Sequence, residues 1–346
     1  MSHDLAASGD AAPLVRRRSV LTCAAAVVLV LALAGCTAAE PEAGPTANPT
    51  AASPTQTPTP APIPTPTPPP TPTPTPTPVV FDPAEAFATV EHLATEIGPR
   101  EAASTAFDQA VQYVQSRFET LGYRVTEMPV PVPAGDSWGV PVEAGTSENV
   151  IADPPGFDPT EPNVVIGAHL DTVAVAPGAE DNGSGVGVVL ELARMAAEQP
   201  PRVPVRFIAF GAEEPRGRGD DLHHFGSQDY VAALSAAERR AVRAMVSLDR
   251  VGVRADAVPV STGGTGTTTV MDELLAAAGS ADVPARQDEQ NRASDHWSFE
   301  KADIPAARIG SVPYAAYHSA DDLPQVVDTR QLDRVGTIVW TWLQTL

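Results

Sequence analysis

Hydrophobic and polar residues alternate along residues 79–346 in a way that predicts short buried strands separated by amphipathic helices. The run Asn163 to Ala168 is apolar after its first residue, as expected for a strand that is buried on both faces of a sheet. Further strands are predicted at residues 123–130, 149–152, 205–210, 244–248 and 304–309.

Helices are predicted between these strands. Asp82, Pro83 and Glu85 supply an N-cap residue, a proline at the first helical position and a capping-box acid, so a helix begins there. Apolar residues three or four positions apart over 107–121 indicate a second helix, which Gly122 ends. The alternation predicts an α/β fold, a three-layer α/β/α sandwich around a central, largely parallel mixed sheet. Further helices are predicted at about residues 185–197, 270–278 and 329–345.

The first 78 residues contain little that could build a hydrophobic core, so a single folded domain is predicted in residues 79–346. Residues 1–36 are predicted to be an export signal, because three arginines precede an apolar run of about sixteen residues that ends in small residues. A transmembrane helix is the alternative, although the run is short for one. The final Leu-Ala-Gly-Cys resembles a bacterial lipobox, in which Cys36 would carry a lipid, and residues 17–21 resemble a twin-arginine signal.

Residues 37–78 are interpreted as a linker. Prolines and threonines alternate from Pro41 to Pro78, with 16 prolines in that segment. This composition favours extended polyproline II, which rises about 3 Å per residue, so the segment would span on the order of 100 Å. We expect a spacer that carries the folded domain through a cell-wall layer; a low-complexity tail without such a role fits the same residues.

The formal net charge of -21 narrows the range of partners. Only three of the 22 basic residues precede residue 79, so nearly all of the excess acid lies on the folded part. Such a surface repels nucleic acid and anionic lipid headgroups, which predicts no nucleic-acid partner and no membrane contact except through a lipid on Cys36. Cys23 and Cys36 both precede the domain, so a metal site within it must use histidine and carboxylate side chains.

Histidine and acidic residues follow four of the predicted strands. In open α/β sheets, ligands bind at the carboxyl ends of the strands, so these segments are expected to converge on one crevice. The segments are residues 168–185, 210–215, 247–252 and 316–322.

His169 and Asp171 stand two positions apart on an extended segment, so both side chains can face the same site. A histidine that binds zinc through one nitrogen is commonly oriented through the other by a carboxylate, and we assign these roles to His169 and Asp171. A strand-end histidine with a chance acidic neighbour is the alternative. Asp181 is a short carboxylate that could bridge two ions, although the sequence Asp-Asn-Gly-Ser also suits a turn or a helix N-cap.

Glu213 and Glu214 form the most informative pair. Two adjacent carboxylates at a buried strand end repel each other unless a cation compensates one of them, which leaves the other free to act as a base. A solvent-exposed pair in a loop is the alternative. Asp249, after the strand at 244–248, and His318, in an acidic loop, are the remaining candidate ligands.

Together these residues resemble the co-catalytic dizinc aminopeptidases that include the secreted bacterial leucyl aminopeptidases (metallopeptidase family twenty-eight). The resemblance runs from Ile-Gly-Pro-Arg at residues 97–100 to the C-terminal helix, and it is strongest over residues 163–193. It implies the zinc exopeptidase fold, two zinc ions per chain and peptide substrates with a free N-terminus. With the lipobox it also implies an extracytoplasmic protein that is lipid-anchored at the cell membrane, from which it could be released to the cell wall or medium.

The resemblance assigns the metal ligands residue by residue. His169 and Asp249 would hold one zinc ion, while Glu214 and His318 would hold the other. Asp181 would bridge the two ions, and the peptide bond that follows it would be cis.

The same resemblance assigns the catalytic roles. Glu213 would act as a general base on a water shared by the two ions and would then pass the proton to the leaving amine. Tyr317 would donate a hydrogen bond to the oxyanion, and Asp171 would orient His169.

Two features depart from the usual pattern of that family. Residues 215–225 are longer than the usual segment and carry His223 and His224, which either rim the pocket or, as we expect, lie in a solvated loop. Arg250 stands where an apolar residue is usual, and it either binds a substrate carboxylate or pairs with a local acid. Ser-Asp-His at residues 294–296 is not a catalytic triad, because consecutive residues cannot place nucleophile, base and orienting acid in line.

We therefore predict a zinc-dependent aminopeptidase anchored as a lipoprotein. The alternatives are a glutaminyl cyclase-like acyltransferase with a single zinc ion, a carboxypeptidase in which Arg250 binds the C-terminal carboxylate, and an inactive surface-binding module. The presence of all five ligand positions favours the dizinc peptidase over the cyclase and over the inactive module.

Overall fold

The computed structural model describes residues 78–346. The predicted export signal and all but the last residue of the predicted linker lie outside the described residues. Within them, eight strands form one sheet in the order β1-β4-β6-β5-β7-β10-β8-β9, and β2 and β3 form a separate hairpin. The strands are β1 Arg124–Val132, β2 Gly135–Ser137, β3 Val140–Val142, β4 Gly145–Asp153, β5 Asn163–His169, β6 Val205–Phe210, β7 Val242–Leu248, β8 Val258–Ser261, β9 Ala285–Gln287 and β10 Ala306–Ile309.

The sheet is mixed, with a parallel centre. Strands β6, β5, β7 and β10 are parallel to their neighbours within this group. Towards the two edges, β4 pairs antiparallel with β6 and β1, and β8 pairs antiparallel with β10. The carboxyl ends of the four central strands therefore lie along one edge of the sheet, which is where ligands bind in folds of this kind.

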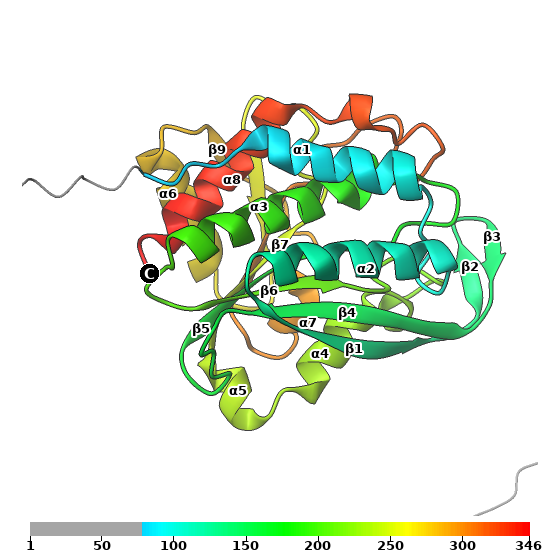
Figure 1. Ribbon diagram of the computed structural model, residues 1–346, viewed down its shortest axis with the longest axis horizontal. Coiled ribbons are helices and arrows are strands. Elements are labelled where there is room, and N and C mark those ends of the chain that lie inside the picture. Colours follow the sequence, from blue (N-terminus) through cyan, green and yellow to red (C-terminus); the bar gives the residue numbers. More distant parts are fainter. Residues whose placement is uncertain (1–77) are drawn as a thin grey trace, which may run out of the picture. The chain divides into compact units, whose positions relative to one another are not determined.

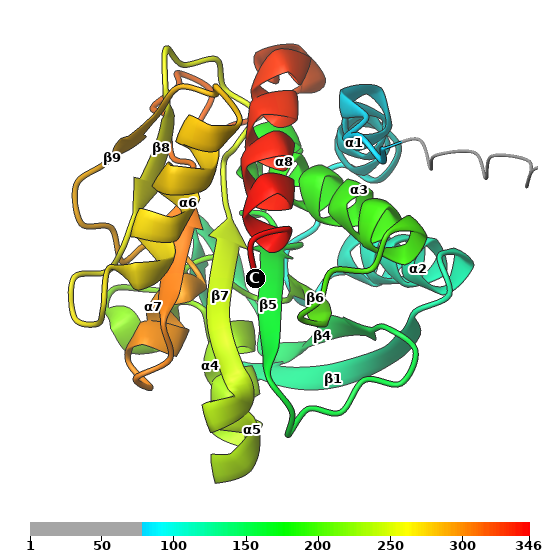
Figure 2. The ribbon, with the colours of Figure 1, turned by 90° about the vertical axis from the view of Figure 1, so that its left-hand side faces the viewer.

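Helices cover both faces of the sheet (Figures 1 and 2). Helices α1, α2, α3, α6 and α8 pack into the larger hydrophobic core, and α4 and α7 pack into a smaller one on the opposite face. Because side chains alternate along a strand, Val164 and Ile166 of β5 enter the larger core while Val165 enters the smaller. The helices are α1 Pro83–Glu91, α2 Thr105–Thr120, α3 Gly185–Glu198, α4 Phe225–Ala233, α5 Ala236–Ala241, α6 Thr269–Ser280, α7 His296–Glu300 and α8 Thr329–Leu343.

This arrangement confirms the predicted three-layer sandwich, and the strongest sequence signals agree with it in detail. Asp82 caps α1 by accepting the N–H of Ala84, with Pro83 at the first helical position. A π-helix, η1 (His92–Ile97), then continues α1, and Gly122 follows α2 with a φ of 86°. The hairpin β2–β3, strands β8 and β9, and helices α4, α5 and α7 are not predicted by the sequence pattern.

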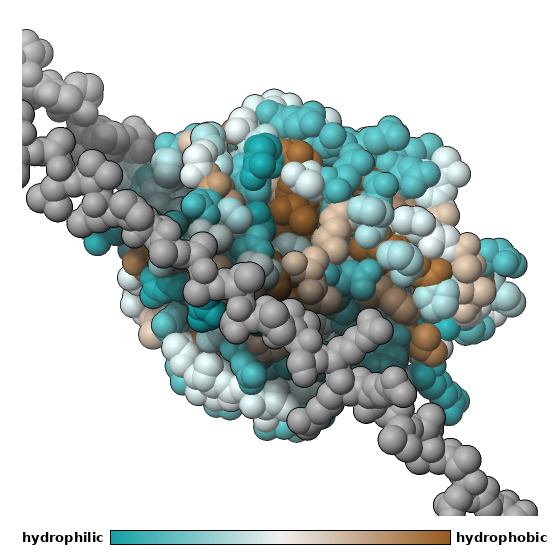
Figure 3. All heavy atoms as spheres, turned by 90° about the horizontal axis from the view of Figure 1, so that it is seen from below, coloured by the Kyte–Doolittle hydropathy of each residue, from teal (hydrophilic) through white to brown (hydrophobic). Residues whose placement is uncertain are grey.

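The surface of the described part is largely hydrophilic on the one face that Figure 3 shows. On the face shown in Figure 3, hydrophilic residues predominate, and hydrophobic residues lie scattered among them in small groups. Among residues 78–346, no helix combines the length and the apolar character needed to cross a membrane.

Candidate metal centre and active site

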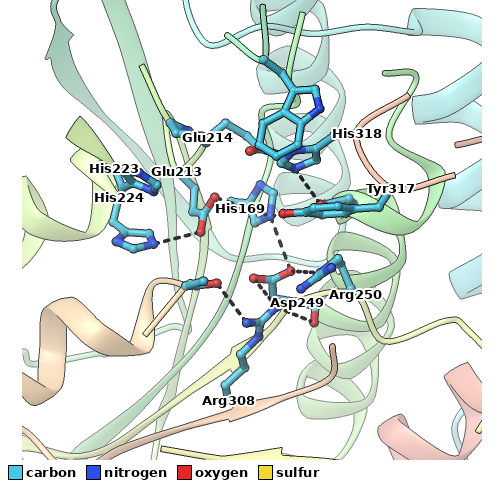
Figure 4. A pocket seen from close by; sticks show the side chains of 14 residues that line it. His169, Glu213, Glu214, His223, His224, Asp249, Arg250, Arg308, Tyr317 and His318 are labelled. Atoms are coloured by element: carbon cyan, nitrogen blue, oxygen red, sulfur yellow. Dashed lines mark hydrogen bonds and ion pairs between the residues drawn. The ribbon is translucent and has the colours of Figure 1, made fainter. Parts of the chain in front are cut away.

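One pocket lies at the carboxyl ends of the central strands, and it contains every side chain that the sequence indicates as a metal ligand (Figure 4). The catalytic candidates Glu213 and Tyr317 line the same pocket. The five ligand candidates are His169 at the end of β5, Asp181 in the π-helix η2 (Ala179–Ser184), Glu214 after β6, Asp249 after β7 and His318 between β10 and α8.

Asp181 lies between the two histidines of the pocket. Its Oδ1 atom is 3.1 Å from Nε2 of His169, and its Oδ2 atom is 3.2 Å from Nε2 of His318. All three side chains are buried. The peptide bond between Asp181 and Asn182 is cis, as the family resemblance implies. The two oxygens of one carboxylate thus face two different histidines, as in a residue that bridges two metal sites.

Two groups of potential metal ligands share Asp181. Donor atoms of His169, Asp181 and Asp249 lie within 4.8 Å of one another, and so do those of Asp181, Glu214 and His318. A third combination, His169 with Glu213 and Glu214, meets the same distance. The first two groups correspond to the two ligand sets that the family resemblance implies.

The chemistry of these donors fits a divalent cation. Within residues 78–346, Oδ1 of Asp249 and Oε1 of Glu214 are buried and accept no hydrogen bond. Although burial opposes its protonation, the charges of Glu214 and Asp181 raise the pKa of His318 to about 10. A buried oxygen that accepts no hydrogen bond is costly, and a cation bound to it would remove that cost. Imidazole and carboxylate ligands without cysteine are a common donor set for zinc.

Asp171 lies directly behind the pocket. Its two carboxylate oxygens accept the main-chain N–H groups of Glu213 at 2.9 Å and of Glu214 at 3.1 Å. Nδ1 of His169 is 3.1 Å from the main-chain oxygen of Asp171 and 3.8 Å from its nearest carboxylate oxygen. Asp171 therefore contacts His169, but through its carbonyl group instead of the carboxylate that the sequence interpretation assigned. Its carboxylate fixes the backbone that carries the two glutamates.

Two further carboxylates accept hydrogen bonds from main-chain N–H groups in the same way. The sequence pattern did not indicate either of them. Asp322 accepts the N–H groups of Glu180 at 3.0 Å and of Asp181 at 3.1 Å. Glu180 in turn accepts those of Gly252 at 2.9 Å and of Val253 at 3.0 Å. Each carboxylate joins two segments that are far apart in the sequence, so the loops around the pocket are fastened to one another.

Two arginines flank Asp249. Nη2 of Arg308 is 3.0 Å from Oδ2 of Asp249, whereas Nε of Arg250 is 3.9 Å from Oδ1. Although burial opposes ionisation, the charges of Arg308 and of His169 hold the pKa of Asp249 far below its usual value. Arg308 was not predicted as a site residue, although a charged residue within the apolar run 304–309 was a signal for it.

Glu213 faces a histidine that was not expected in the pocket. Oε1 of Glu213 is 3.2 Å from Nε2 of His224, and both side chains are buried. Burial raises the pKa of Glu213 to about 8, against the opposing influence of His169. The expectation of a solvated loop is wrong for His224, because its N–H donates to the carbonyl of Glu213 at 2.8 Å and folds the segment back. His223 lines the pocket and is partly exposed.

Arg216 anchors the start of the segment 215–225. Its Nη1 donates to the carbonyl oxygens of Pro133 and Glu143, both at 2.7 Å, and its Nη2 forms an ion pair with Glu101. Pro133 and Glu143 flank the hairpin β2–β3 on its two sides. The buried guanidinium therefore joins the segment to the hairpin.

The middle of the same segment is fixed to α7. The carboxylate of Asp220 accepts hydrogen bonds from Nε1 of Trp297 at 2.9 Å and from Nζ of Lys301 at 2.6 Å. The segment is therefore a bridge between the hairpin and α7, and it forms part of the pocket wall.

Two aromatic residues cover His318. The ring of Tyr317 stacks on the imidazole with 3.7 Å between centroids, and the Trp138 ring meets it edge-on at 4.4 Å. Trp138 occupies the turn of the hairpin with a φ of 54° and is 53% exposed. Burial and the charge of Asp181 raise the pKa of Tyr317 above its usual value, so its phenol keeps the proton that it would donate. Trp138 is a further pocket residue that the sequence pattern did not indicate.

The residues Ser294, Asp295 and His296 do not form a catalytic triad. The Ser294 hydroxyl is 2.8 Å from the Ser247 hydroxyl, and Nε2 of His296 is 2.7 Å from the carbonyl oxygen of Asn291. The rejection of a serine-hydrolase mechanism on sequence grounds is therefore supported by the contacts of these side chains.

A pocket lined by histidine and carboxylate side chains lies at the carboxyl ends of the central strands of a mixed sheet. These features define the class of protein, which is a metallohydrolase with the zinc exopeptidase fold. The sequence model of Peptidase family M28 matches residues 149–343, which are more than half of the chain. The chain belongs to peptidase family M28. The family that the sequence resemblance indicates is thereby confirmed.

Individual relatives are matched over part of their length. Aminopeptidase YwaD of Bacillus subtilis (strain 168) is 33% identical over 204 residues, which are 56% of this chain and 43% of that protein. Leupeptin-inactivating enzyme 1 of Streptomyces exfoliatus is 29% identical over 271 residues, which are 70% of this chain and 57% of that protein. The chain thus spans about half the length of the curated relatives that it matches.

Solved structures of proteins with different activities have the same fold as this chain. BSAP, a zinc aminopeptidase from Bacillus subtilis, superimposes with a TM-score of 0.68 at 20% identity and covers 77% of this chain and 95% of its own. The glutaminyl cyclase of Bacteroides thetaiotaomicron has a TM-score of 0.67 at 21% identity and covers 78% of this chain and 100% of its own. The fold is therefore common to both activities, and the choice between them depends on the site.

Proposed function

We propose that this chain is a zinc-dependent aminopeptidase that removes N-terminal residues from peptides. The observation that carries the proposal is Asp181, whose two carboxylate oxygens face His169 and His318. A carboxylate shared by two ligand groups suits a pair of divalent cations, which many aminopeptidases use. The names of YwaD and BSAP, both aminopeptidases, support the same choice.

Five side chains would hold the two zinc ions. His169 and Asp249 would bind one ion, Glu214 and His318 would bind the other, and Asp181 would bind both. Bound in this way, the ions would lower the pKa of a water molecule and polarise the carbonyl group of the substrate.

Glu213 is proposed as the general base. One of its carboxylate oxygens contacts Nε2 of His224 at 3.2 Å, and the other lies 4.0 Å from Nε2 of His169, on the side of the ligands. The carboxylate would take a proton from the attacking water and deliver it to the leaving amine. Asp171 would support this role by fixing the main chain at Glu213 and Glu214.

Tyr317 is proposed to stabilise the oxyanion of the tetrahedral intermediate. Its ring is held against His318, and Figure 4 shows its hydroxyl group directed towards the side of the pocket on which His169 lies. A donor that is already in place loses little free energy to reorganisation when negative charge develops on the substrate oxygen.

We further propose that the domain acts outside the cytoplasm. The lipobox-like sequence before Cys36 supports a lipid anchor at the cell membrane, and the proline-rich residues 37–78 support a spacer between that anchor and the domain. The acidic domain would then contact the membrane only through the lipid.

Hydrolysis of matched substrates tests the proposed activity. The purified protein should release 4-nitroaniline from aminoacyl anilides and leave their N-acetylated counterparts intact, and elemental analysis should approach two zinc ions per chain. Cyclisation of glutaminyl peptides with one zinc ion would establish the cyclase instead. Release of C-terminal residues from N-blocked peptides would establish a carboxypeptidase, and a zinc-loaded protein without turnover would be the binding module.

A further inference from the structure

One cationic side chain in the pocket has few protein partners. Arg250 directly follows Asp249 and lines the pocket beside Tyr317 and Trp138. A guanidinium group has several N–H donors in a planar fork. Within residues 78–346, the guanidinium of Arg250 donates a single hydrogen bond, from Nη2 to Oγ of Ser311 at 2.5 Å. Most of its donors are therefore available to a ligand.

The guanidinium of Arg250 is held in place. It lies over the ring of Tyr317, with Cζ 4.4 Å from the ring centroid, and the side chain is 14% exposed. The main-chain N–H donates to Oδ1 of Asn182, and the residue has a φ of 55°, which is uncommon for residues other than glycine. A guanidinium that is already stacked and oriented loses little conformational entropy on binding a planar carboxylate.

The nearest protein carboxylate, that of Asp249, forms no hydrogen bond with this guanidinium. Asp249 pairs with Arg308 at 3.0 Å, whereas Nε of Arg250 is 3.9 Å from Asp249, which is beyond hydrogen-bond distance. Arg250 thus has a charge interaction with a local acid at this longer distance, and it keeps N–H donors that a substrate carboxylate could accept. Figure 4 shows Arg250 next to Asp249 and Tyr317 at the pocket, while Arg308 approaches Asp249 from a different direction.

We propose that Arg250 binds a carboxylate group of the substrate, so that peptides with a carboxylate within reach of Arg250 are the preferred substrate class. This inference rests on the proposed aminopeptidase function and adds a specificity to it. The carboxylate is either the side chain of an N-terminal glutamate or aspartate, or the free C-terminus of a short peptide. Two parallel N–H···O bonds from guanidinium to carboxylate provide both charge and geometry, which a neutral substrate group of the same size cannot match.

Two pairs of substrates separate the two sources of the carboxylate. The first pair is the 4-nitroanilide of glutamate against that of methionine, which have side chains of similar length and no C-terminal carboxylate. The second pair is the dipeptide Met-Ala against Met-Ala-amide, which differ only at the C-terminus. The proteins are the wild type, Arg250→Met, Arg250→Lys and the control Arg254→Met, because Arg254 is an exposed arginine of the same loop.

Arg250→Met should lower kcat/KM for the carboxylate-bearing member of one pair by about tenfold to a hundredfold, mainly through KM, and change the neutral member about twofold or less. Arg250→Lys should restore part of the loss, and Arg254→Met should behave as the wild type. Zinc content, measured by elemental analysis, should be the same in all four proteins.

The pattern of losses decides between the outcomes. A loss confined to the glutamyl anilide assigns the carboxylate to the N-terminal residue, and a loss confined to Met-Ala assigns it to the C-terminus. Equal losses for both members of each pair, or no loss, would overturn the inference and leave Arg250 as a structural residue. If zinc-loaded wild type hydrolyses none of the four substrates, the proposed function fails, and the inference that rests on it fails as well.

Discussion

Glu213 and Glu214 are neighbours in the sequence, yet their surroundings differ. Oε1 of Glu214 is 3.2 Å from Nε2 of His318, so this carboxylate belongs to the proposed ligand set. Glu213 instead directs Oε1 towards Nε2 of His224, 3.2 Å away. At the scale of single residues, the histidine that each carboxylate contacts therefore distinguishes the proposed ligand, Glu214, from the proposed base, Glu213.

This separation predicts different defects for two conservative substitutions. Glu213→Gln keeps the size of the side chain but cannot accept a proton, so turnover should fall by roughly 10²–10⁴ while zinc content is unchanged. Glu214→Gln removes a charged ligand, so zinc content and activity should fall together. Kinetics and elemental analysis with and without excess zinc distinguish them, because added zinc should partly rescue only Glu214→Gln. Near-normal turnover of Glu213→Gln, or loss of zinc from it, would contradict the assignment.

Asp322 provides a second test at the residue scale. In Asp322→Asn one of the two acceptor oxygens becomes an amide NH₂, so one of the N–H groups of Glu180 and Asp181 loses its partner. We expect the free energy of unfolding to fall by about 1–3 kcal/mol, measured by urea denaturation, together with weaker zinc binding. The control is Asp321→Asn, because Asp321 is exposed. Equal stability of the two variants would show that the backbone contacts of Asp322 contribute little.

The candidate ligands His169, Glu214 and Asp249 could be proposed from the sequence because each lies at or soon after the end of a recognisable hydrophobic strand. Asp181 and His318 lie farther from a strand end, and their candidacy depends more on the family resemblance. His224 could not, because a polar segment rich in Gly, Arg and Asp has the composition of an exposed loop, and only its contacts bury the histidine. Asp322 is indistinguishable in sequence from the exposed Asp321. Arg308 could have been found, because a charge inside a buried strand requires a partner.

At the scale of elements, the hairpin β2–β3 determines part of the pocket, because its turn carries Trp138. The hairpin packs closely against Arg216, and a Cβ atom added at Gly135 would lie 2.1 Å from the main-chain oxygen of Arg216. The N–H of Asp136 also donates to that oxygen at 3.1 Å. The hairpin is therefore positioned by the segment 215–225 as well as by its own turn.

We expect Arg216→Met to release the hairpin from this support. The carbonyl oxygens of Pro133 and Glu143 would lose their donor, so the free energy of unfolding should fall by about 1–3 kcal/mol, measured by urea denaturation. Because Trp138 lines the pocket, KM should rise more than kcat falls. Arg218→Met is the control, because Arg218 is exposed in the same segment. An unchanged KM in Arg216→Met would mean that the hairpin does not depend on this anchor.

A long apolar run or a strong cap made some element bounds predictable, as for the whole of β5 and for the start of α1. The missed elements are short and depend on tertiary contacts. Strand β9 has three residues and pairs only with β8, which itself contains Pro259. Helix α7 has five residues and is stabilised by packing between α4 and the sheet. Local sequence does not determine such elements, and it does not determine the order of strands in the sheet.

At the scale of the whole molecule, the proposed anchor predicts how the protein fractionates. Cys36→Ser should prevent acylation and move the protein from the membrane fraction to the soluble fraction, with mass spectrometry of the mature N-terminus as the measurement. Cys23→Ser is the matched control, because Cys23 lies within the apolar run of the signal, which cleavage would remove from the protein. Wild-type protein that is soluble in the medium with an unmodified Cys36 would contradict the anchor.

The carboxylates of Asp171, Asp322 and Glu180 have a consequence for how the proposed metal ions would enter and leave. Each fastens the loops around the pocket through main-chain N–H groups, and these fastenings belong to the polypeptide itself. We expect, therefore, that a chelator followed by cobalt or manganese exchanges the ions in the folded protein, with a far-UV circular dichroism spectrum that stays constant throughout. The metal that occupies the site would then depend on which ions are available to the folded protein. It would not depend on which ion was present while the chain folded.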